Sequence, residues 1–126
     1  MEITVTVHGE PDVLPYTKRF QFQNTDDRIF IASCEKIRKM LERQQKININ
    51  ETLLLFSAFV VSSMKDGNGE SRIKEEASSL LSPDQVMIGV PEMLRRLDFE
   101  IILEKAFTVS IYRPIPVQDF TLNSTM

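Results

Sequence analysis

The chain has 126 residues, 42% of them hydrophobic, and this length suits one globular domain. Its formal net charge of -3 argues against a general nucleic-acid or membrane binder, since both normally carry a basic excess. The single cysteine, Cys34, excludes an internal disulfide, and the start "MEITVTVHGE" lacks the features of a secretory signal. The longest apolar run, from Leu53 to Val61, is too short to span a bilayer. We therefore expect a cytoplasmic protein.

The first 24 residues have the pattern of two β-strands. Ile3, Val5 and Val7 alternate with polar residues, which is the period of a strand buried on one face. The stretch "RFQFQN" alternates again, and turn-forming residues separate the two: Gly9, Pro11 and Pro15. We expect a loose antiparallel pair.

A first helix is predicted to follow. Thr25 is a candidate N-cap, with Asp26 and Asp27 in the first turn, where the helix dipole favours acidic side chains. One apolar stripe then recurs at helical spacing, made by Phe30, Cys34, Ile37 and Leu41.

A second helix is predicted from Asn48 to about Met64. Asn48 and Glu51 have the spacing of a capping box. The centre, "LLLFSAFVV", is apolar nearly all round, which is typical of a helix that is covered on most sides. In a chain this small, we expect that another subunit supplies part of the cover. Gly67 or Gly69 is suited to the positive φ that ends such a helix.

A third helix and two short helical segments are predicted next, and two helix-breaking residues separate the short segments. A third helix is predicted at about 70–81, with one apolar face: Ile73, Ala77, Leu80 and Leu81. Ser82, Pro83 and Gln85 then form an S-x-x-Q capping box that starts a short helix. Gly89 suits the left-handed position after that helix, and Pro91 suits the first position of another short turn, "PEMLRR".

The stretch from residue 97 to 114 has the pattern of a β-hairpin. With "EKA" as a three-residue loop, Phe99, Ile101 and Leu103 stand opposite Ile111, Val109 and Phe107. A two-residue "EK" turn would scatter the apolar residues over both faces, so the longer loop is favoured. The predicted fold class is α+β: a bundle of three to four helices followed by a C-terminal β-hairpin, with an N-terminal β-strand extension.

Residues suited to catalysis or to soft metals are scarce. His8 is the only histidine and Cys34 the only cysteine, from which we infer that no soft-metal cluster, Cys-His pair or Ser-His-Asp triad is assembled within one chain. We expect His8 to be a strand or loop residue and Cys34 a small core residue. The glycines of "KDGNGE" lack the spacing of a phosphate loop. We predict no catalytic, cofactor-binding or metal-binding residue.

Charged residues leave two other functions open. Five basic residues gather on the first helix, interleaved with Glu35 and Glu42: Lys36, Arg38, Lys39, Arg43 and Lys46. They are compatible with a free-standing adaptor or nucleic-acid-binding module. Carboxylates are compatible with a small enzyme, but Glu75 and Glu76 beside Lys74 are typical of a solvated helix face. Arg95 and Arg96 suit a helix C-terminus.

One long motif resembles a known family. "LSPDQVMIGVPEML" is similar to the D-Q-V-M-x-G-[IV]-P-E-M stretch of the urease gamma (small) subunit. Upstream, "IRKMLERQQKININETLLLFSAFVVSSMKDG" resembles the first two helices of that family, and "RPI" at 113–115 resembles the end of its last strand. The resemblance covers roughly residues 28–115.

The resemblance implies a non-catalytic subunit of a urease, which hydrolyses urea to ammonia and carbamate. The two nickel ions and their ligands belong to the large subunit, so the resemblance implies no cofactor bound by this chain. The implied partners are the urease beta and alpha (large) subunits and other copies of the same protomer, in a trimer or larger assembly, with no nucleic acid and no membrane.

Three departures from the family stand out. Residues 1–24 have no counterpart in its usual short form, the loop in "LEKAF" is shorter than the usual hairpin turn, and Gly69 stands where a Ser cap is common. We divide the chain into a strand-forming extension (1–24), a urease gamma-like domain (25–115) and a tail (116–126). We expect the strand with Ile3, Val5 and Val7 to add to a sheet edge of a neighbouring subunit.

Overall fold

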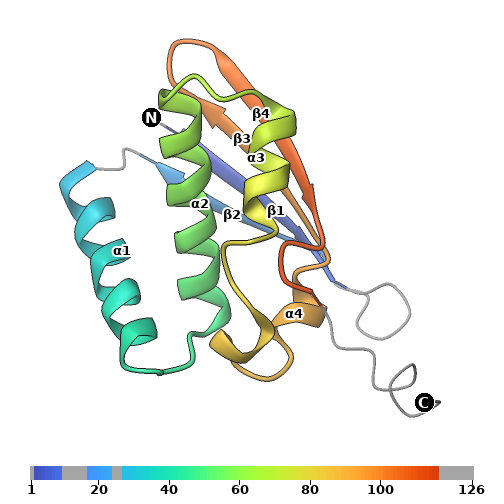
Figure 1. Ribbon diagram of the computed structural model, residues 1–126. Helices are drawn as coiled ribbons and strands as arrows, with labels where there is room; N and C mark the ends of the chain where they lie inside the picture. Colours follow the sequence, from blue (N-terminus) through green and yellow to red (C-terminus); the bar gives the residue numbers. More distant parts are fainter. Residues whose placement is uncertain (1, 10–16, 24–26, 117–126) are drawn as a thin grey trace.

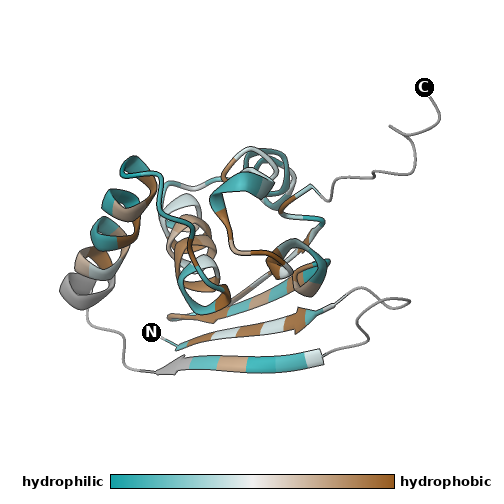
Figure 2. Ribbon diagram, turned by 90° about the horizontal axis from the view of Figure 1, so that it is seen from below, coloured by the Kyte–Doolittle hydropathy of each residue, from teal (hydrophilic) through white to brown (hydrophobic). Residues whose placement is uncertain are grey.

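The computed structural model describes residues 2–9, 17–23 and 27–116, and shows an α+β fold of two layers. Four strands form one antiparallel sheet, and the helices cover one of its faces (Figure 1; Figure 2). No helix of the described residues covers the other face, which is called the open face below. The predicted fold class is therefore confirmed. Within the described part of the chain, no helix is long and apolar enough to cross a membrane.

The N-terminal strand lies inside the sheet of its own chain. β1 (Glu2–His8) pairs with β2 (Thr17–Gln23) on one side and with β3 (Arg96–Ile102) on the other, and β4 (Ala106–Tyr112) completes the order β2-β1-β3-β4. The predicted pairing of β1 with β2 is confirmed. The prediction that β1 adds to a neighbouring subunit is wrong, because both edges of β1 already carry strands of this chain.

Apolar residues form continuous rows across the covered face of the sheet. Val5 stands opposite Phe99, and Phe99 stands opposite Val109. The rows on either side pair Ile3 with Ile101 and Val7 with Leu97. All of these side chains are buried in one hydrophobic core. The central position of β1 is thus what joins the two ends of the chain in a single packed layer.

The hairpin register differs by two residues from the prediction. Ile101 pairs with Phe107 and Phe99 with Val109, so the three-residue loop is Leu103–Lys105 and not "EKA". Because a shift of two keeps every side chain on the same face, the apolar face was predicted correctly and only the partners were wrong. The observed register buries Leu97 completely and leaves Leu103 at the tip, 58% exposed.

The helical layer begins with α1 (Asp27–Glu42) and α2 (Ile49–Lys65). The predicted cap at Thr25 with Asp26, and the side chains of Phe22 and Phe30, lie outside the described residues. Asn48 and Glu51 form the predicted capping box, with side-chain to backbone hydrogen bonds of 2.8 and 2.9 Å. α2 lies between α1 and α3 (Figure 1).

α3 (Glu70–Ala77) ends four residues before the prediction. The N–H of Ser79 donates to the carbonyl of Glu76 and that of Leu80 to the carbonyl of Ala77, and these shorter-range bonds close the last turn. Gly67, with φ of 82°, lies just before this helix and takes the predicted left-handed conformation, whereas Gly69 does not.

The helical breakers act as predicted. The segment from Pro83 to Gln85 is one short 3-10 turn (η1) with the Ser82 capping box, and α4 (Val90–Met93) follows it. Gly89 separates them with φ of 92°. α4 starts one residue before Pro91, so this proline occupies the second helical position instead of the first.

Candidate functional site

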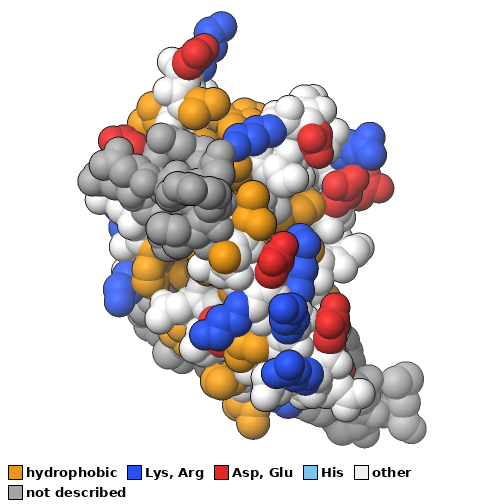
Figure 3. All heavy atoms as spheres, turned by 90° about the vertical axis from the view of Figure 1, so that its left-hand side faces the viewer, with side chains coloured by type: hydrophobic (Ala, Val, Ile, Leu, Met, Phe, Trp, Pro, Cys, Tyr) orange, Lys and Arg blue, Asp and Glu red, His pale blue; other side chains and the backbone are white. Residues whose placement is uncertain are grey.

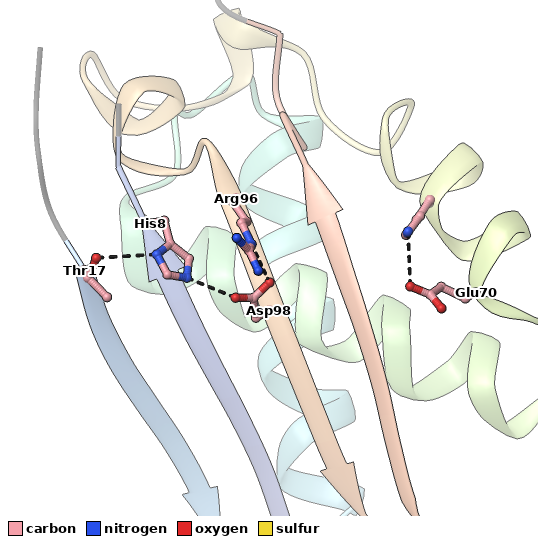
Figure 4. A network of polar contacts seen from close by, with 6 residues as sticks. His8, Thr17, Glu70, Arg96 and Asp98 are labelled. Atoms are coloured by element: carbon pink, nitrogen blue, oxygen red, sulfur yellow. Dashed lines mark hydrogen bonds and ion pairs between the residues drawn. The ribbon is translucent and has the colours of Figure 1, made fainter. Parts of the chain in front are cut away.

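A polar network lies on the open face of the sheet, where β1, β2 and β3 run side by side (Figure 4). The Nε2 atom of His8 is 3.0 Å from Oδ2 of Asp98, and the other oxygen of Asp98 accepts a 2.8 Å hydrogen bond from Nε of Arg96. Arg96 stands directly opposite His8, so the His8–Asp98 contact is a diagonal one between paired strands. The guanidinium of Arg96 also lies 5.2 Å from the centre of the Tyr112 ring.

His8 also contacts a hydroxyl. Oγ1 of Thr17 is 3.4 Å from Nδ1 of His8, so a hydroxyl, an imidazole and a carboxylate stand in the order found in hydrolase triads. One histidine is enough for such an arrangement, so the residue count alone does not exclude a triad, and its absence stays a prediction. The geometry argues against catalysis: the Thr17 contact is longer than the hydrogen bond that activates a nucleophile, and Asp98 is shared with Arg96.

The neighbours of Asp98 favour its ionised form. Partial burial alone raises the pKa of Asp98, but hydrogen bonds from Arg96, Ser110 and His8, with the positive charge of Arg96, outweigh it and lower the pKa below its ordinary value of 3.8. The network is thus a structural clasp that ties the end of β1 to β3. Sequence reasoning missed it because His8 and Asp98 are 90 residues apart.

Removing the charge of Asp98 should reveal this clasp. We expect Asp98→Asn to lower the free energy of unfolding at pH 7 by roughly 1–2 kcal/mol, since charged hydrogen bonds are lost at a partly exposed site. A carboxyl whose folded pKa is depressed contributes stability above its unfolded pKa and loses it as the pH falls through the folded value. The difference between wild type and variant should therefore begin to shrink below about pH 3.8 and disappear once the pH is below the lowered folded pKa.

Guanidinium chloride unfolding at several pH values measures this difference. Glu100→Gln, an exposed carboxylate two positions further along β3, is the matched control and should change little. A stability difference for Asp98→Asn that stays constant down to pH 2 would contradict the role given to its charge.

Other residues that the sequence singled out are buried in the core or form surface ion pairs. Cys34 is buried in the core as predicted, and burial raises the pKa of its thiol even though Arg38 lowers it in part. Glu76 pairs with Arg72 along the exposed face of α3, at 2.9 Å. Lys74 pairs with Glu70 at 3.1 Å. These side chains form the solvated helix face that was predicted for "KEE".

Arg95 and Arg96 do not lie at a helix C-terminus, contrary to the prediction. α4 ends at Met93, and the N–H of Arg95 donates to the carbonyl of His8. Arg96 is the first residue of β3. The prediction was wrong because "PEMLRR" forms only one helical turn before the strand begins, and pairing with β1 determines where the strand starts.

The described residues offer no donor set that suits a soft or borderline metal. Over 2–9, 17–23 and 27–116, no three His, Cys, Asp or Glu side chains lie close enough together to hold a metal ion. His8 is already bonded to Asp98, and Cys34 is buried away from it in the helical layer. An imidazole-rich nickel site does not fit these residues.

The outer surface of the helical layer has two notable features. The five basic residues predicted for the first helix are all exposed, although Arg43 and Lys46 follow the end of α1, and Lys and Arg side chains gather on this face (Figure 3). A groove of about 710 Å³ lies between α1, α2 and α3. Its lining includes the apolar side chains Leu55, Ala58 and Phe59 of α2, with Arg38 and Glu76 from the flanking helices.

Comparison with known proteins identifies the family. The sequence profile of the family described as "Urease, gamma subunit" matches residues 21–115. The chain belongs to the urease gamma subunit family. It is also 30% identical over 94 residues to "Urease subunit gamma" of Prochlorococcus marinus (strain AS9601), which covers 74% of this chain and 94% of that relative.

Membership in the urease gamma family makes the chain a subunit of a urea-hydrolysing enzyme complex, and it confirms the resemblance inferred from "LSPDQVMIGVPEML". The matched residues contain all helices, the hairpin and the end of β2. β1 lies before the matched residues, although it is an interior strand of the sheet. The polar clasp therefore joins Asp98, which lies within the residues matched by the family profile, to His8, which lies before them.

Proposed function

We propose that this chain is a non-catalytic structural subunit of a nickel-dependent urease, which hydrolyses urea to ammonia and carbamate, with carbon dioxide formed from the carbamate afterwards. The observation that carries this proposal is the family match over residues 21–115. The catalytic site, with two nickel ions, then belongs to the large subunit. The possible nickel ligands of this chain support that division, since the chain holds one histidine and one buried cysteine.

The proposed partners are the urease beta and alpha subunits and further copies of the same protomer, in a trimer or larger assembly in the cytoplasm. The groove between α1, α2 and α3 is a candidate surface for burial, because the half-buried Phe59 and Ala58 face it on the most apolar helix. The division into 1–24, 25–115 and 116–126 stays a prediction, in which the first part now supplies strands to the sheet of the second.

Co-purification tests the proposal. The full chain carrying an affinity tag should be expressed together with urease beta and alpha chains from the same organism, in a host that supplies nickel and the urease accessory proteins. We expect one large particle on size exclusion that contains all the chains, binds nickel and releases ammonia from urea. A tagged chain that elutes alone, while the other chains assemble into an active urease without it, would overturn the proposal.

The exposed basic surface of α1 supports the alternative of a free-standing adaptor or nucleic-acid-binding module. The size-exclusion fractions of the co-purification experiment decide between this alternative and a urease subunit. An adaptor would elute without the urease chains, and a nucleic-acid binder would shift a labelled duplex or single strand with a strong dependence on salt. We expect neither, because the family match favours a urease subunit over an adaptor and the net charge of -3 argues against a nucleic-acid binder.

A further inference from the structure

An apolar tip projects from the loop between η1 and α4. Ile88 is 100% exposed and Met87 beside it is 46% exposed. Most single exposed apolar residues need no explanation, but here two large ones are adjacent and one makes no packing contact at all. Val86, directly before this pair, and Val90, two residues after it, are buried in the core.

The backbone of the tip is held firmly. The N–H of Met87 donates to the carbonyl of Ile47 at 2.9 Å, and the N–H of Ile47 donates to the carbonyl of Gln85 at 3.1 Å. The N–H of Val90 then closes a turn by donating to the carbonyl of Met87 at 3.1 Å. Two hydrogen bonds to the α1–α2 connection and one across the turn thus fix the direction in which Ile88 points.

The turn itself does not require isoleucine. Gly89 has φ of 92° and ψ of -18°, and Ile88 is not among the residues with positive φ, which together define a type II turn over 87–90. Proline is the favoured residue at the position of Ile88 in such a turn. Neither the core nor the local backbone of the described residues accounts for a large apolar side chain at this position.

Basic side chains flank the tip. Ile47, to which the tip is hydrogen-bonded, directly follows Lys46, and Arg43 lies three residues before Lys46, directly after the last residue of α1. Both are exposed, and Figure 3 shows hydrophobic side chains at the lower edge of this face below the gathered Lys and Arg side chains. Asp84 is the nearby acidic group on η1, and the charge of Lys46 acts on it.

We propose that the Met87–Ile88 tip is an anchor that enters an apolar pocket with an acidic rim on another subunit of the urease complex. This inference rests on the proposed function. A rigid apolar anchor loses little conformational freedom on binding and is the kind of group that contributes most to an interface. Lys46 and Arg43 then meet the rim, where opposite charge fixes the orientation of the two subunits.

The test uses the co-expressed urease chains, with the full-length tagged chain as bait. Ile88→Ser should weaken the binding of the tagged chain to the other urease chains roughly tenfold or more, because an isoleucine buried in a pocket accounts for at least a tenfold change in affinity. Ile88→Val keeps most of the apolar surface and should retain most of the binding. The matched control is Leu103→Ser at the hairpin tip, 58% exposed, which should leave binding unchanged.

The outcomes separate this inference from the proposed function. If the wild-type chain does not co-purify with the urease chains, the proposed function and the anchor both fail. If the wild-type chain co-purifies and Ile88→Ser does so equally well, only the anchor is overturned. Thermal unfolding of the isolated variants should match the wild type, since Ile88 makes no core contact. Reversal of Lys46 to Glu should weaken binding at low salt, and unchanged binding would remove the acidic rim from the proposal.

Discussion

Val5→Lys is expected to lower the free energy of unfolding of the isolated chain by at least about 3 kcal/mol, because it places an unpaired charge in the core. Val5 is fully buried at the centre of β1, between Phe20 of β2 and Phe99 of β3. Domains have only about 5–15 kcal/mol of total stability, so the variant should be largely unfolded at moderate temperature.

Thr4→Lys is the matched control. Thr4 is the neighbouring residue on the open face of the sheet, where it stands opposite Glu100 and is partly exposed. A lysine there should change stability by no more than about 0.5 kcal/mol. Thermal unfolding followed by circular dichroism measures both variants. If Val5→Lys melts like the wild type when isolated and weakens only the assembled complex, then β1 does serve a neighbouring subunit and its place in this sheet is wrong.

Phe56→Ala should have an effect of similar size, a loss of about 3–5 kcal/mol, because it leaves a large cavity in a packed core. Phe56 is fully buried on α2. Phe59, one turn along the same helix, is only partly buried and lines the groove between the helices, so Phe59→Ala should cost much less. Denaturant unfolding at pH 7 compares the two variants. Equal losses would mean that the groove side of α2 is as closely packed as its core side, contrary to the structure.

Local patterns predicted most of the secondary structure. The Asn48 capping box, the left-handed Gly89 and the alternating strands are each determined by a few neighbouring residues, and all were found. Helix ends were less certain: α3 stops at Ala77 because the next residues close the turn with shorter-range bonds.

Pairing between distant segments was not predictable in the same way. Alternation with a period of two fixes which face of a strand is buried but does not distinguish registers that differ by two residues, which is the error made for the hairpin. It also does not tell which strands are neighbours. The position of β1 beside β3, and with it the His8–Asp98 contact, depends on the whole sheet.

The two surfaces considered for binding partners also differ in whether the sequence alone could predict them. The basic face of α1 follows directly from helical spacing. The exposed tip at Ile88 could not be inferred from "VMIGV", because a run of apolar residues gives no sign of which one is excluded from the core. The hydrogen bonds that turn Ile88 outward join the tip to Ile47, far away in sequence.

Ammonia release by the purified full-length chain, incubated with urea and nickel, tests the central claim most directly. The account predicts no release above the blank from this chain alone and sustained release from the particle that also contains the large subunit. Turnover by the isolated chain, lost in an Asp98→Asn or His8→Phe variant, would show a catalytic centre in this chain and contradict the account.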